Sequence, residues 1–483
     1  MVKITMIGAG SIIFCKHIIQ DIMTYPALKD SHIALMDIDE RRLDQVYKVL
    51  NRVKEERGLS CTFSRHTDRA KALDGANFVI SMIQVGGLDP YIIDIEIPLK
   101  YGIDQCVGDT LGPGGIFRGL RHVAVLVDII RDVDRYSAKD VIFINYCNPM
   151  AICTWAIRKV CPEIESVGIC HGVQYTTQML CNWLGVPYEE CDLLTAGINH
   201  MAWFLSITYR GKDLYPRIWE KIATEGHKPE ENFRFEMMKA TGYFMTETSG
   251  HLSEYLPYFR NRADLMELFS GPGFMGESGA YLKLNLYLRD MNDKMMSDWA
   301  SGDSMVEFSE SRSIEFAAPI MNAKVTGSPV RIAGNVLNNG LIENLPAGCC
   351  VEVPVFVDSL GLHPVSIGKL PEHCAALCRS NISVQELALK AALEGDKEAA
   401  FHACLVDPLT AAVLAPHEIR NMVDELFAAQ DAWLPQFKGK ENSTPSNTIG
   451  RRETSDFTVN RGRAMMDEWK PHEFDPNNII YFL

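Results

Sequence analysis

The sequence contains no pair of cysteines in a CxxC arrangement, although it has fourteen cysteines in all. This absence argues against a zinc ribbon and against a thioredoxin-like redox site. The sequence also has no apolar run near the roughly 20 residues that a membrane span requires. The short apolar run at its start leads directly into a glycine turn, which predicts a first β-strand and not a signal peptide. We therefore expect a cytoplasmic protein whose cysteines are mostly reduced and buried.

An excess of positive charge is missing as well. The formal net charge is −15, and nucleic acids and anionic membranes both require a basic surface, so we expect neither as a partner. There is no low-complexity segment and no internal repeat. A chain of 483 residues with 47% hydrophobic and 23% charged residues is too long for one average core, which predicts two joined globular domains.

The first part of the chain alternates strand-like and helix-like segments. A charged amphipathic pattern predicts a helix over residues 40–57, and apolar residues at helical spacing predict another over residues 121–136. This alternation is typical of an α/β fold with a parallel, doubly wound sheet, which binds ligands at the carboxyl ends of its strands. The predicted strands cover residues 2–7, 32–37, 77–83, 141–146 and 165–170.

The regular alternation ends near residue 195, and a mixture of longer helices and strands follows. This mixture predicts a C-terminal α+β catalytic domain, followed by a polar extension. The predicted helices cover residues 281–296, 309–321, 372–393 and 416–431, and the predicted strands cover residues 330–334 and 350–357. The resulting division is a nucleotide-binding domain over residues 1–195, a catalytic domain over 196–434 and an extension over 435–483.

The motif IGAGS lies between the first predicted strand and its helix. Gly8 and Gly10 let the backbone turn tightly and approach a pyrophosphate, and the helix that begins near Ser11 offers free N–H groups. The third glycine of the usual fingerprint is absent, so a plain strand-to-helix turn is the alternative. Asp37 ends the second strand, where a carboxylate can bind the ribose diol of NAD and disfavour the phosphate of NADP; Asp39 is the alternative carboxylate. These features predict a Rossmann-type NAD-binding domain.

Two further segments supply candidate contacts for a substrate. The segment GDTLGPGGIFRGLR is rich in glycine, which predicts a rigid loop before a helix that carries Arg118 and Arg121. We interpret it as a clamp for substrate and nicotinamide, and the alternative is an unusual loop with two exposed arginines. Asn148 follows the strand over residues 141–146, and its amide can donate to and accept from sugar hydroxyls. The alternative is a helix cap before the next proline.

Cys170 and His200 each follow a predicted strand, so they can converge at one edge of the sheet. A thiolate and an imidazole can share one divalent metal ion, and two protein ligands leave positions open for a substrate. A buried structural role is the alternative for each residue alone. In the polar segment over residues 246–255, His251, Glu254 and Tyr255 share a helix face by their spacing, which makes them candidates for proton transfer. The alternative is a polar helix start with capping residues.

Seven segments of the chain, taken together, resemble glycoside hydrolase family 4. The resemblance runs from Lys3 to about Leu434 and comes closest to the melibiase-like α-galactosidases of that family. It implies a fold related to lactate and malate dehydrogenases, and an enzyme that uses NAD and a divalent metal on a small α-glycoside. It also implies a homodimer or a homotetramer. The segments are IGAGS, ALMDID, DTLGPGGIFRGLR, NYCNPM, CHGV, AGINHMAW and ENLPAGCCVEVPVFVD.

The resemblance implies an unusual reaction, because NAD-dependent members of this family are exceptions to hydrolysis by two carboxylates. NAD⁺ takes a hydride from C3 of the sugar, and the resulting ketone acidifies the proton at C2. A base removes that proton while the metal stabilises the enediolate, and the aglycone leaves from C1 by elimination. Water then adds, and the retained NADH returns the hydride. NAD is therefore a resident catalyst that is not consumed.

The resemblance also implies roles for individual residues. Cys170 and His200 would bind the metal, expected to be Mn²⁺, together with O2 and O3 of the sugar. His171 stands where phospho-α-glucosidase relatives carry the general acid, and an imidazole can fill that role near neutral pH. The base is expected to be Tyr255 or His251. The residues expected to grip the sugar are Asp109, Arg118 and Asn148.

The tetrad that begins at Cys170 bears on the choice of sugar. It is Cys-His-Gly-Val here, whereas melibiase-like members typically have Cys-His-Ser-Val, galacturonidase-like members Cys-His-Glu-Val and some α-glucosidases Cys-His-Gly-His. Phospho-sugar branches carry Asp or Asn after the cysteine, which disfavours a 6-phosphoglycoside. We expect an α-galactosidase, with an α-glucosidase or an α-galacturonidase as alternatives. A simple dehydrogenase that accumulates NADH and a sugar sensor without turnover are the remaining readings.

Overall fold

Six parallel strands form the first part of one sheet in the computed structural model, which describes residues 1–309 and 311–440. Their order across the sheet is β3-β2-β1-β4-β5-β6, the strand order of a dinucleotide-binding Rossmann fold. The predicted parallel, doubly wound sheet is therefore confirmed, with β3 as an additional strand whose mostly polar sequence gives no strand signal. The strands are β1 (Lys3–Ile7), β2 (His32–Met36), β3 (Thr62–His66), β4 (Phe78–Ser81), β5 (Ile142–Asn145) and β6 (Glu165–Gly168).

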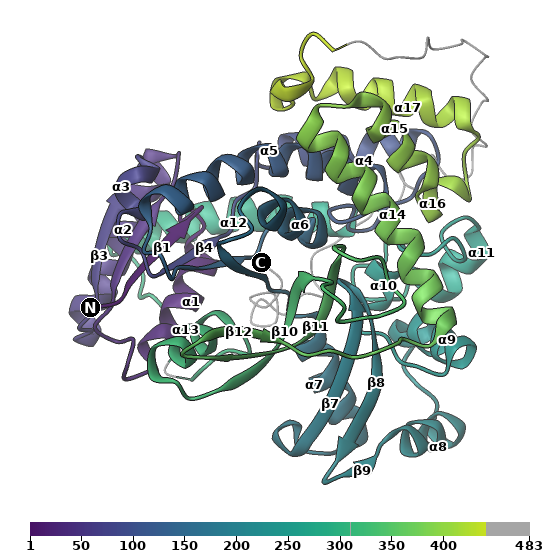
Figure 1. The fold of residues 1–483 in the computed structure, drawn as a ribbon, viewed down its shortest axis with the longest axis horizontal. Coiled ribbons are helices and arrows are strands. Elements are labelled where there is room, and N and C mark those ends of the chain that lie inside the picture. The colour runs from purple at the N-terminus through teal and green to yellow at the C-terminus, as the bar shows by residue number, and fades with distance from the viewer. Residues whose placement is uncertain (310, 441–483) are drawn as a thin grey trace.

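Helices cover both faces of these strands (Figure 1). They are α1 (Ile12–Met23), α2 (Glu40–Arg57), α3 (Arg69–Leu73), α5 (Gly112–Tyr136) and α6 (Met150–Val160). Two other helices of this half lie elsewhere: α4 (Asp89–Lys100) packs on α5, and α7 (Gly172–Leu184) packs beside the second half of the chain. Strand side chains accordingly alternate between two apolar clusters. Ile80 and Ile144 belong to a cluster with residues of α1 and α2, whereas Val79 and Phe143 belong to a cluster with residues of α3 and α5. Burial on both faces explains why these strands have nearly unbroken apolar sequences.

Helix α5 begins inside the glycine-rich segment, at Gly112, where the sequence predicts a rigid loop. A Cβ on Gly115 would lie 2.4 Å from the backbone carbon of Thr110, so glycine allows the first turn to pack directly on the preceding chain. Arg118 and Arg121 follow in the same helix and are both buried. The alternative of two exposed arginines is therefore wrong.

The second half of the chain extends the same sheet with antiparallel strands. These are β7 (Cys191–Ile198), β8 (Met201–Tyr209), β9 (Lys212–Asp213), β10 (Val330–Leu337), β11 (Cys350–Asp358) and β12 (Gly361–Pro364). The β10–β11 hairpin lies between β6 and the β7–β8 hairpin, and each junction is narrow. One residue pair, Asn335 with Gly168, joins β10 to β6, and one pair, Glu352 with Gly197, joins β11 to β7. The boundary predicted at residue 195 falls within β7, and this division into domains remains a prediction.

Helix α13 begins at Ala317, whereas the sequence predicts a helix from residue 309. The residues before it lie against α1, where the backbone N–H of Ser313 donates to Asp21 Oδ1 at 2.8 Å. This contact uses a backbone donor that a helix would need, so the predicted start is wrong. The remaining helices are α8 (Tyr215–Glu225), α9 (Asn232–Thr241), α10 (Ser249–Leu252), α11 (Ala263–Leu265), α12 (Ala280–Ser301), α13 (Ala317–Thr326), α14 (Glu372–Glu394), α15 (Lys397–Val406), α16 (Pro408–Ala411) and α17 (Pro416–Ala429).

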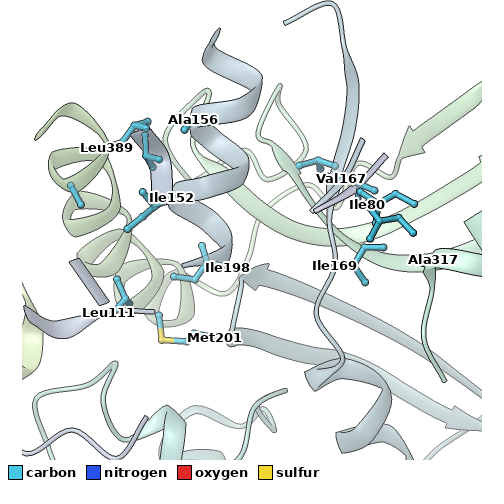
Figure 2. Packing of buried hydrophobic residues seen from close by; sticks show 14 of the residues in the cluster. Ile80, Leu111, Ile152, Ala156, Val167, Ile169, Ile198, Met201, Ala317 and Leu389 are labelled. Carbon is cyan, nitrogen blue, oxygen red and sulfur yellow. The ribbon is translucent and has the colours of Figure 1, made fainter. Parts of the chain in front are cut away.

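One apolar core joins the two halves of the chain. In Figure 2, Ile152 of α6 faces Leu389 of α14, and Ile198 and Met201 at the tip of the β7–β8 hairpin lie beside Leu111. The core therefore fixes the hairpin tip against the start of α5.

All fourteen cysteines lie in the described part of the chain as free thiols, and most are buried, as expected. Most of the predicted C-terminal extension, residues 441–483, lies outside the described residues.

Candidate active site

One pocket collects polar side chains from the chain segments that follow β5, β6 and β7 and from the segment before α5. This is the edge of the sheet at which a doubly wound fold binds its ligands. Of the residues predicted to bind the sugar or the metal or to transfer protons, Arg118 and Tyr255 are not part of the wall and contact residues that are. The predicted site residues that line the pocket are Asp109, Asn148, Cys170, His171, His200 and His251.

Cys170 lies in the short turn between β6 and α7 and is buried. Burial raises the pKa of its thiol well above the usual value, and the carboxylates of Glu247 and Glu352 raise it further, against hydrogen bonds from Gly172 and Asn199. A buried thiol of this kind ionises only when a cation compensates its charge. The environment of Cys170 therefore does not favour a free thiolate nucleophile, and the thiol could ionise there beside a bound cation.

His200 lies in the two-residue turn of the β7–β8 hairpin, which the pairing of Ile198 with Met201 closes. Its φ of 62° falls in the left-handed region, which residues with a side chain rarely adopt. The turn brings the imidazole Nε2 to 3.0 Å from Cys170 Sγ. Burial lowers the pKa of His200 to about 4, so the ring is neutral, which is the form that binds metals.

Glu247 is a residue of the site that the sequence analysis misses. Its Oε2 lies 3.7 Å from His200 Nε2, and the ligand atoms of Cys170, His200 and Glu247 all lie within 4.8 Å of one another. Gly172 leaves room for this carboxylate, since a Cβ there would come within 2.8 Å of Glu247 Oε2. The available sequence signal was the place of Glu247 in the polar segment over residues 246–255.

The donor set of this cluster fits a divalent transition metal. A thiolate, an imidazole and a carboxylate are all ligands for such ions, and the oxygen donor suits Mn²⁺. The other ring nitrogen of His200, Nδ1, lies 3.0 Å from the hydroxyl of Tyr255, a contact that fixes the ring as outer-shell partners of metal ligands do. Tyr255 is fully buried behind His200, so its geometry favours this orienting role.

Asp109 and Asn148 form a polar wall of the pocket. Asn148 Nδ2 donates to Asp109 Oδ2 at 3.0 Å, and Arg118 Nε donates to the carbonyl oxygen of Asn148 at 3.1 Å. Burial disfavours the charged form of Asp109, but Arg118 and the nearby histidines hold its pKa below the usual value. The Oδ1 atom of Asn148 is buried and has no hydrogen-bond partner among the described residues, so it can accept from a sugar hydroxyl.

Arg121 takes no part in the pocket, so its predicted role in a clamp is wrong. Its guanidinium donates to both carboxylate oxygens of Asp94, at 3.0 and 2.6 Å, and Gln430 Nε2 donates to the same carboxylate at 2.8 Å. The side chains of Arg121 and Asp94 are 1% and 0% exposed. This buried ion pair ties α4 and α5 to the end of α17.

The predicted helix face of His251, Glu254 and Tyr255 does not form, because α10 stops before Glu254. Glu254 instead accepts hydrogen bonds from two backbone N–H groups of the segment before α5. His251 lines the pocket, and its Nε2 lies 3.8 Å from Asp109 Oδ1. This nitrogen has no hydrogen-bond partner among the described residues. Of the three residues, His251 is therefore the best placed to meet a substrate.

His171 lines the pocket beside Cys170, and its Nδ1 lies 2.9 Å from Glu315 Oε1. Burial lowers the pKa of His171, but the charge and the hydrogen bond of Glu315 outweigh that effect and leave the pKa above its usual value. The two residues are 144 positions apart in the chain, so no local pattern could have paired them.

The predicted nucleotide turn has the conformation that its glycines allow. Gly8 has a φ of 91°, and a Cβ on it would lie 2.8 Å from the carbonyl oxygen of Met82. The backbone N–H of Gly10 donates to Asp37 Oδ2 at 2.7 Å. Asp39 caps α2 through its side chain, which leaves Asp37 as the carboxylate at the turn.

This turn fits the pyrophosphate and ribose of NAD. Helix α1 begins after Ser11, which is exposed and makes no capping hydrogen bond with its side chain. Its first backbone N–H groups are therefore open to an anion.

Across the described residues, none of the helices combines the length and the apolar character that crossing a membrane demands.

Comparison with known proteins shows the family to which the chain belongs. Residues 3–186 match the model of the family 4 glycosyl hydrolases, and residues 195–410 match the model of the C-terminal domain of that family. The alpha-galactosidase of Rhizobium meliloti (strain 1021) is 40% identical over 441 residues, which cover 90% of this chain and 89% of the relative. The alpha-galactosidase of Bacillus subtilis (strain 168) is also 40% identical, over 91% of this chain and 100% of the relative.

Among solved structures, a putative glucosidase from Bacillus subtilis is 27% identical with a TM-score of 0.79, and the match covers 88% of this chain and 99% of that chain. A 6-phospho-alpha-glucosidase from gut microorganisms, solved with NAD and Mn²⁺, has a TM-score of 0.76 at 21% identity, over 90% of this chain and 100% of that chain, and shows the same fold. The resemblance stated from the sequence motifs is confirmed. The chain belongs to family 4 of the glycosyl hydrolases.

Proposed function

We propose that this protein is an NAD- and Mn²⁺-dependent α-galactosidase that cleaves small α-galactosides. The observation that carries the proposal is the cluster of Cys170, His200 and Glu247 beside His171, in a pocket of a family 4 fold. The two relatives at 40% identity that carry the name alpha-galactosidase support the sugar.

The charge of the pocket supports a neutral sugar. Among the described residues that line it, none is a lysine or an arginine, whereas Asp109 and Glu247 both bring carboxylates. A phosphate or a uronate on the sugar would meet these carboxylates without a lysine or an arginine in the wall to pair with, which disfavours such substrates. The neutral galactoside and glucoside remain, and the relatives favour the galactoside.

We assign the metal to Cys170, His200 and Glu247. When bound there, Mn²⁺ supplies Lewis acidity toward oxygens at C2 and C3 of the sugar. Asp109 and Asn148 would hold the sugar hydroxyls, and Arg118 would keep Asn148 in place through its carbonyl oxygen.

We assign NAD to Gly8, Gly10, Ser11 and Asp37 at the start of α1. When bound there, NAD⁺ supplies a reversible acceptor for the hydride at C3. The open N–H groups of α1 would hold the pyrophosphate, and Asp37 would accept hydrogen bonds from the ribose hydroxyls.

Two proton transfers remain for the side chains of the pocket. His251 is the better placed of the two candidate bases for the proton at C2, and Tyr255, the other candidate, contacts His200. His171 would donate a proton to the glycosidic oxygen as the bond to C1 breaks.

The experiment that tests this function mixes purified, reduced protein with Mn²⁺, NAD⁺ and p-nitrophenyl α-galactoside, and then omits each component in turn. We expect nitrophenol release that requires both Mn²⁺ and NAD⁺, without accumulation of NADH. Stoichiometric NADH would indicate a simple dehydrogenase, and binding without release would indicate a sensor. Release only from the α-glucoside or the α-galacturonide would move the proposal to that sugar.

Replacement of Asp37 by alanine should raise the NAD⁺ concentration for half-maximal activity by about 10- to 100-fold, because hydrogen bonds to a charged group are lost. Titration of NAD⁺ at saturating Mn²⁺ measures this shift. Asp39→Ala is the matched control and should weaken only the cap of α2. A normal titration for Asp37→Ala with a shifted one for Asp39→Ala would assign the ribose to Asp39.

Glu247→Gln should weaken Mn²⁺ binding by roughly 10- to 100-fold, because the substitution removes the only charged oxygen donor of the cluster. Calorimetric titration of the metal-free protein with Mn²⁺ measures the effect. Glu236→Gln on α9, which lies outside the pocket, is the control and should bind Mn²⁺ normally. Equal affinity of both variants would leave Cys170 and His200 as the protein ligands.

The expected homodimer or homotetramer can be checked on the same samples by light scattering.

A further inference from the structure

The residues before α13 form a strap that lies along α1, and we define it as residues 311–316. Arg312 Nε donates to Thr24 Oγ1 at 2.9 Å. The backbone N–H of Ser313 donates to Asp21 Oδ1 at 2.8 Å, and the Ser313 hydroxyl contacts the other oxygen of that carboxylate. The strap is therefore attached to the same helix that begins at the nucleotide turn.

This attachment determines where Glu315 points. The backbone N–H of Glu315 donates to Ser313 Oγ at 3.1 Å, so the serine that contacts α1 also fixes the backbone of the glutamate. The Glu315 side chain is 9% exposed, and its Oε1 reaches Nδ1 of His171 at 2.9 Å. An ionised carboxylate can only accept hydrogen bonds, so the proton of this bond lies on Nδ1.

We propose that Glu315 is a positioning residue that fixes the ring of His171 for proton transfer to the leaving group. With Nδ1 engaged by Glu315, the nitrogen available to the substrate is Nε2. The Nε2 proton passes to the glycosidic oxygen as the C1–O bond breaks, and the ring keeps its Nδ1 proton. This proposal rests on the role of His171 as general acid in the proposed function.

The same arrangement of a carboxylate that orients a histidine occurs in other proton-transfer sites, where it sets the tautomer and direction of the ring without touching the substrate. Here the carboxylate comes from the strap, whereas the histidine comes from the turn after β6. Tyr175 packs edge-on against His171 with ring centroids 5.7 Å apart, which limits rotation of the imidazole on a second side. The ring of His171 is thus held by two groups outside the metal cluster.

The test compares a poor leaving group with a good one. Wild-type protein should cleave methyl and p-nitrophenyl α-galactosides at similar rates, because steps before departure of the aglycone limit turnover. In Glu315→Ala, departure of the aglycone should become rate-limiting for the methyl galactoside, because methanol is a poor leaving group that needs a proton. Nitrophenol leaves without one, so its departure should remain fast. We expect kcat on the methyl galactoside to fall about 10²- to 10³-fold, and kcat on the nitrophenyl galactoside to fall less than about tenfold.

Further variants separate positioning from a structural role. His171→Ala should show the same dependence on the leaving group, and the double variant should lose little more than either single variant. Glu307→Gln, an exposed glutamate near the strap, is the matched control and should leave both rates unchanged. Glu315→Gln preserves the shape of the side chain, and it replaces Glu315→Ala if that variant does not fold. An equal loss on both substrates in the Glu315 variant would overturn the proposal.

A second readout does not depend on activity. With ¹⁵N-labelled histidine, the His171 signals are assigned by their loss in His171→Ala. At a pH where the ring is neutral, they should show the proton on Nδ1 in wild type and a mixture of tautomers in Glu315→Ala. An unchanged tautomer would overturn the positioning role even if the enzyme is active. An equal fall of kcat on both galactosides in His171→Ala, with the expected tautomers in wild type and in Glu315→Ala, would instead contradict the acid role of His171 in the proposed function.

Discussion

Cys170→Ser should abolish turnover on p-nitrophenyl α-galactoside and leave NAD⁺ binding intact. A serine hydroxyl does not ionise in this buried position, so the metal cluster loses the thiolate and its charge. Lewis acidity contributes several kcal/mol to such reactions, which corresponds to a loss of roughly 10³-fold in kcat. Affinity for Mn²⁺ should fall as well, which calorimetric titration measures separately from activity.

The matched control for this variant is Cys161→Ser. Cys161 is a partly exposed thiol at the end of α6 and lies outside the pocket, so its replacement should change neither Mn²⁺ affinity nor kcat. NAD⁺ titration by fluorescence should give the same affinity for wild type and both variants. Full activity of Cys170→Ser at low Mn²⁺ would remove this residue from the site.

Arg121→Ala should unfold the protein at a much lower temperature, because it leaves Asp94 as a buried carboxylate without its cation. Both side chains are almost completely buried, and removal of one partner from such a pair costs about 3–5 kcal/mol. The substitution also removes the hydrogen bond that the guanidinium donates to Gln430 Oε1 at the end of α17. Thermal unfolding followed by circular dichroism measures the change in Tm.

Two comparisons make this prediction specific. Arg289→Ala removes an exposed partner of Asp290 and should change the Tm little, since exposed ion pairs contribute little to stability. The double variant Arg121→Met with Asp94→Leu replaces the pair by apolar side chains and should regain most of the lost stability. A Tm of Arg121→Ala equal to that of wild type would show that Asp94 is protonated or solvated once its partner is gone.

The sequence was sufficient for five of the six parallel strands because these are short apolar runs, whereas β3 is mostly polar and partly exposed. The sequence did not predict that α5 begins within the glycine-rich segment, because glycine lowers helix propensity. The first turn of α5 forms there because Gly115 allows backbone contact with Thr110. The prediction also failed before α13, where Asp21 on another helix competes for the backbone of Ser313. In both places a contact between distant segments decided the local structure.

The candidate site was also predicted only in part. Six predicted residues line one pocket because each follows a strand end or lies in a motif with strong local character. Glu247 and Glu315 escaped prediction because an acidic residue in a polar segment looks the same whether it faces solvent or a metal cluster. Arg121 was assigned to the clamp because it follows the glycine-rich segment, whereas in the fold it pairs with the buried carboxylate of Asp94. Such roles depend on partners that no window of sequence contains.

Backbone strain is concentrated at the pocket. Among the described residues other than glycine, positive φ values occur at His200, Arg210 and Met275, and His200 and Met275 both line the pocket. Each such residue costs about 1–3 kcal/mol relative to an unstrained one. Selection for heat resistance alone would therefore reward glycine or asparagine at positions 200 and 275. In a library of variants sorted only by thermal survival, substitutions at position 200 should be enriched and should lose catalysis, because they remove a proposed metal ligand.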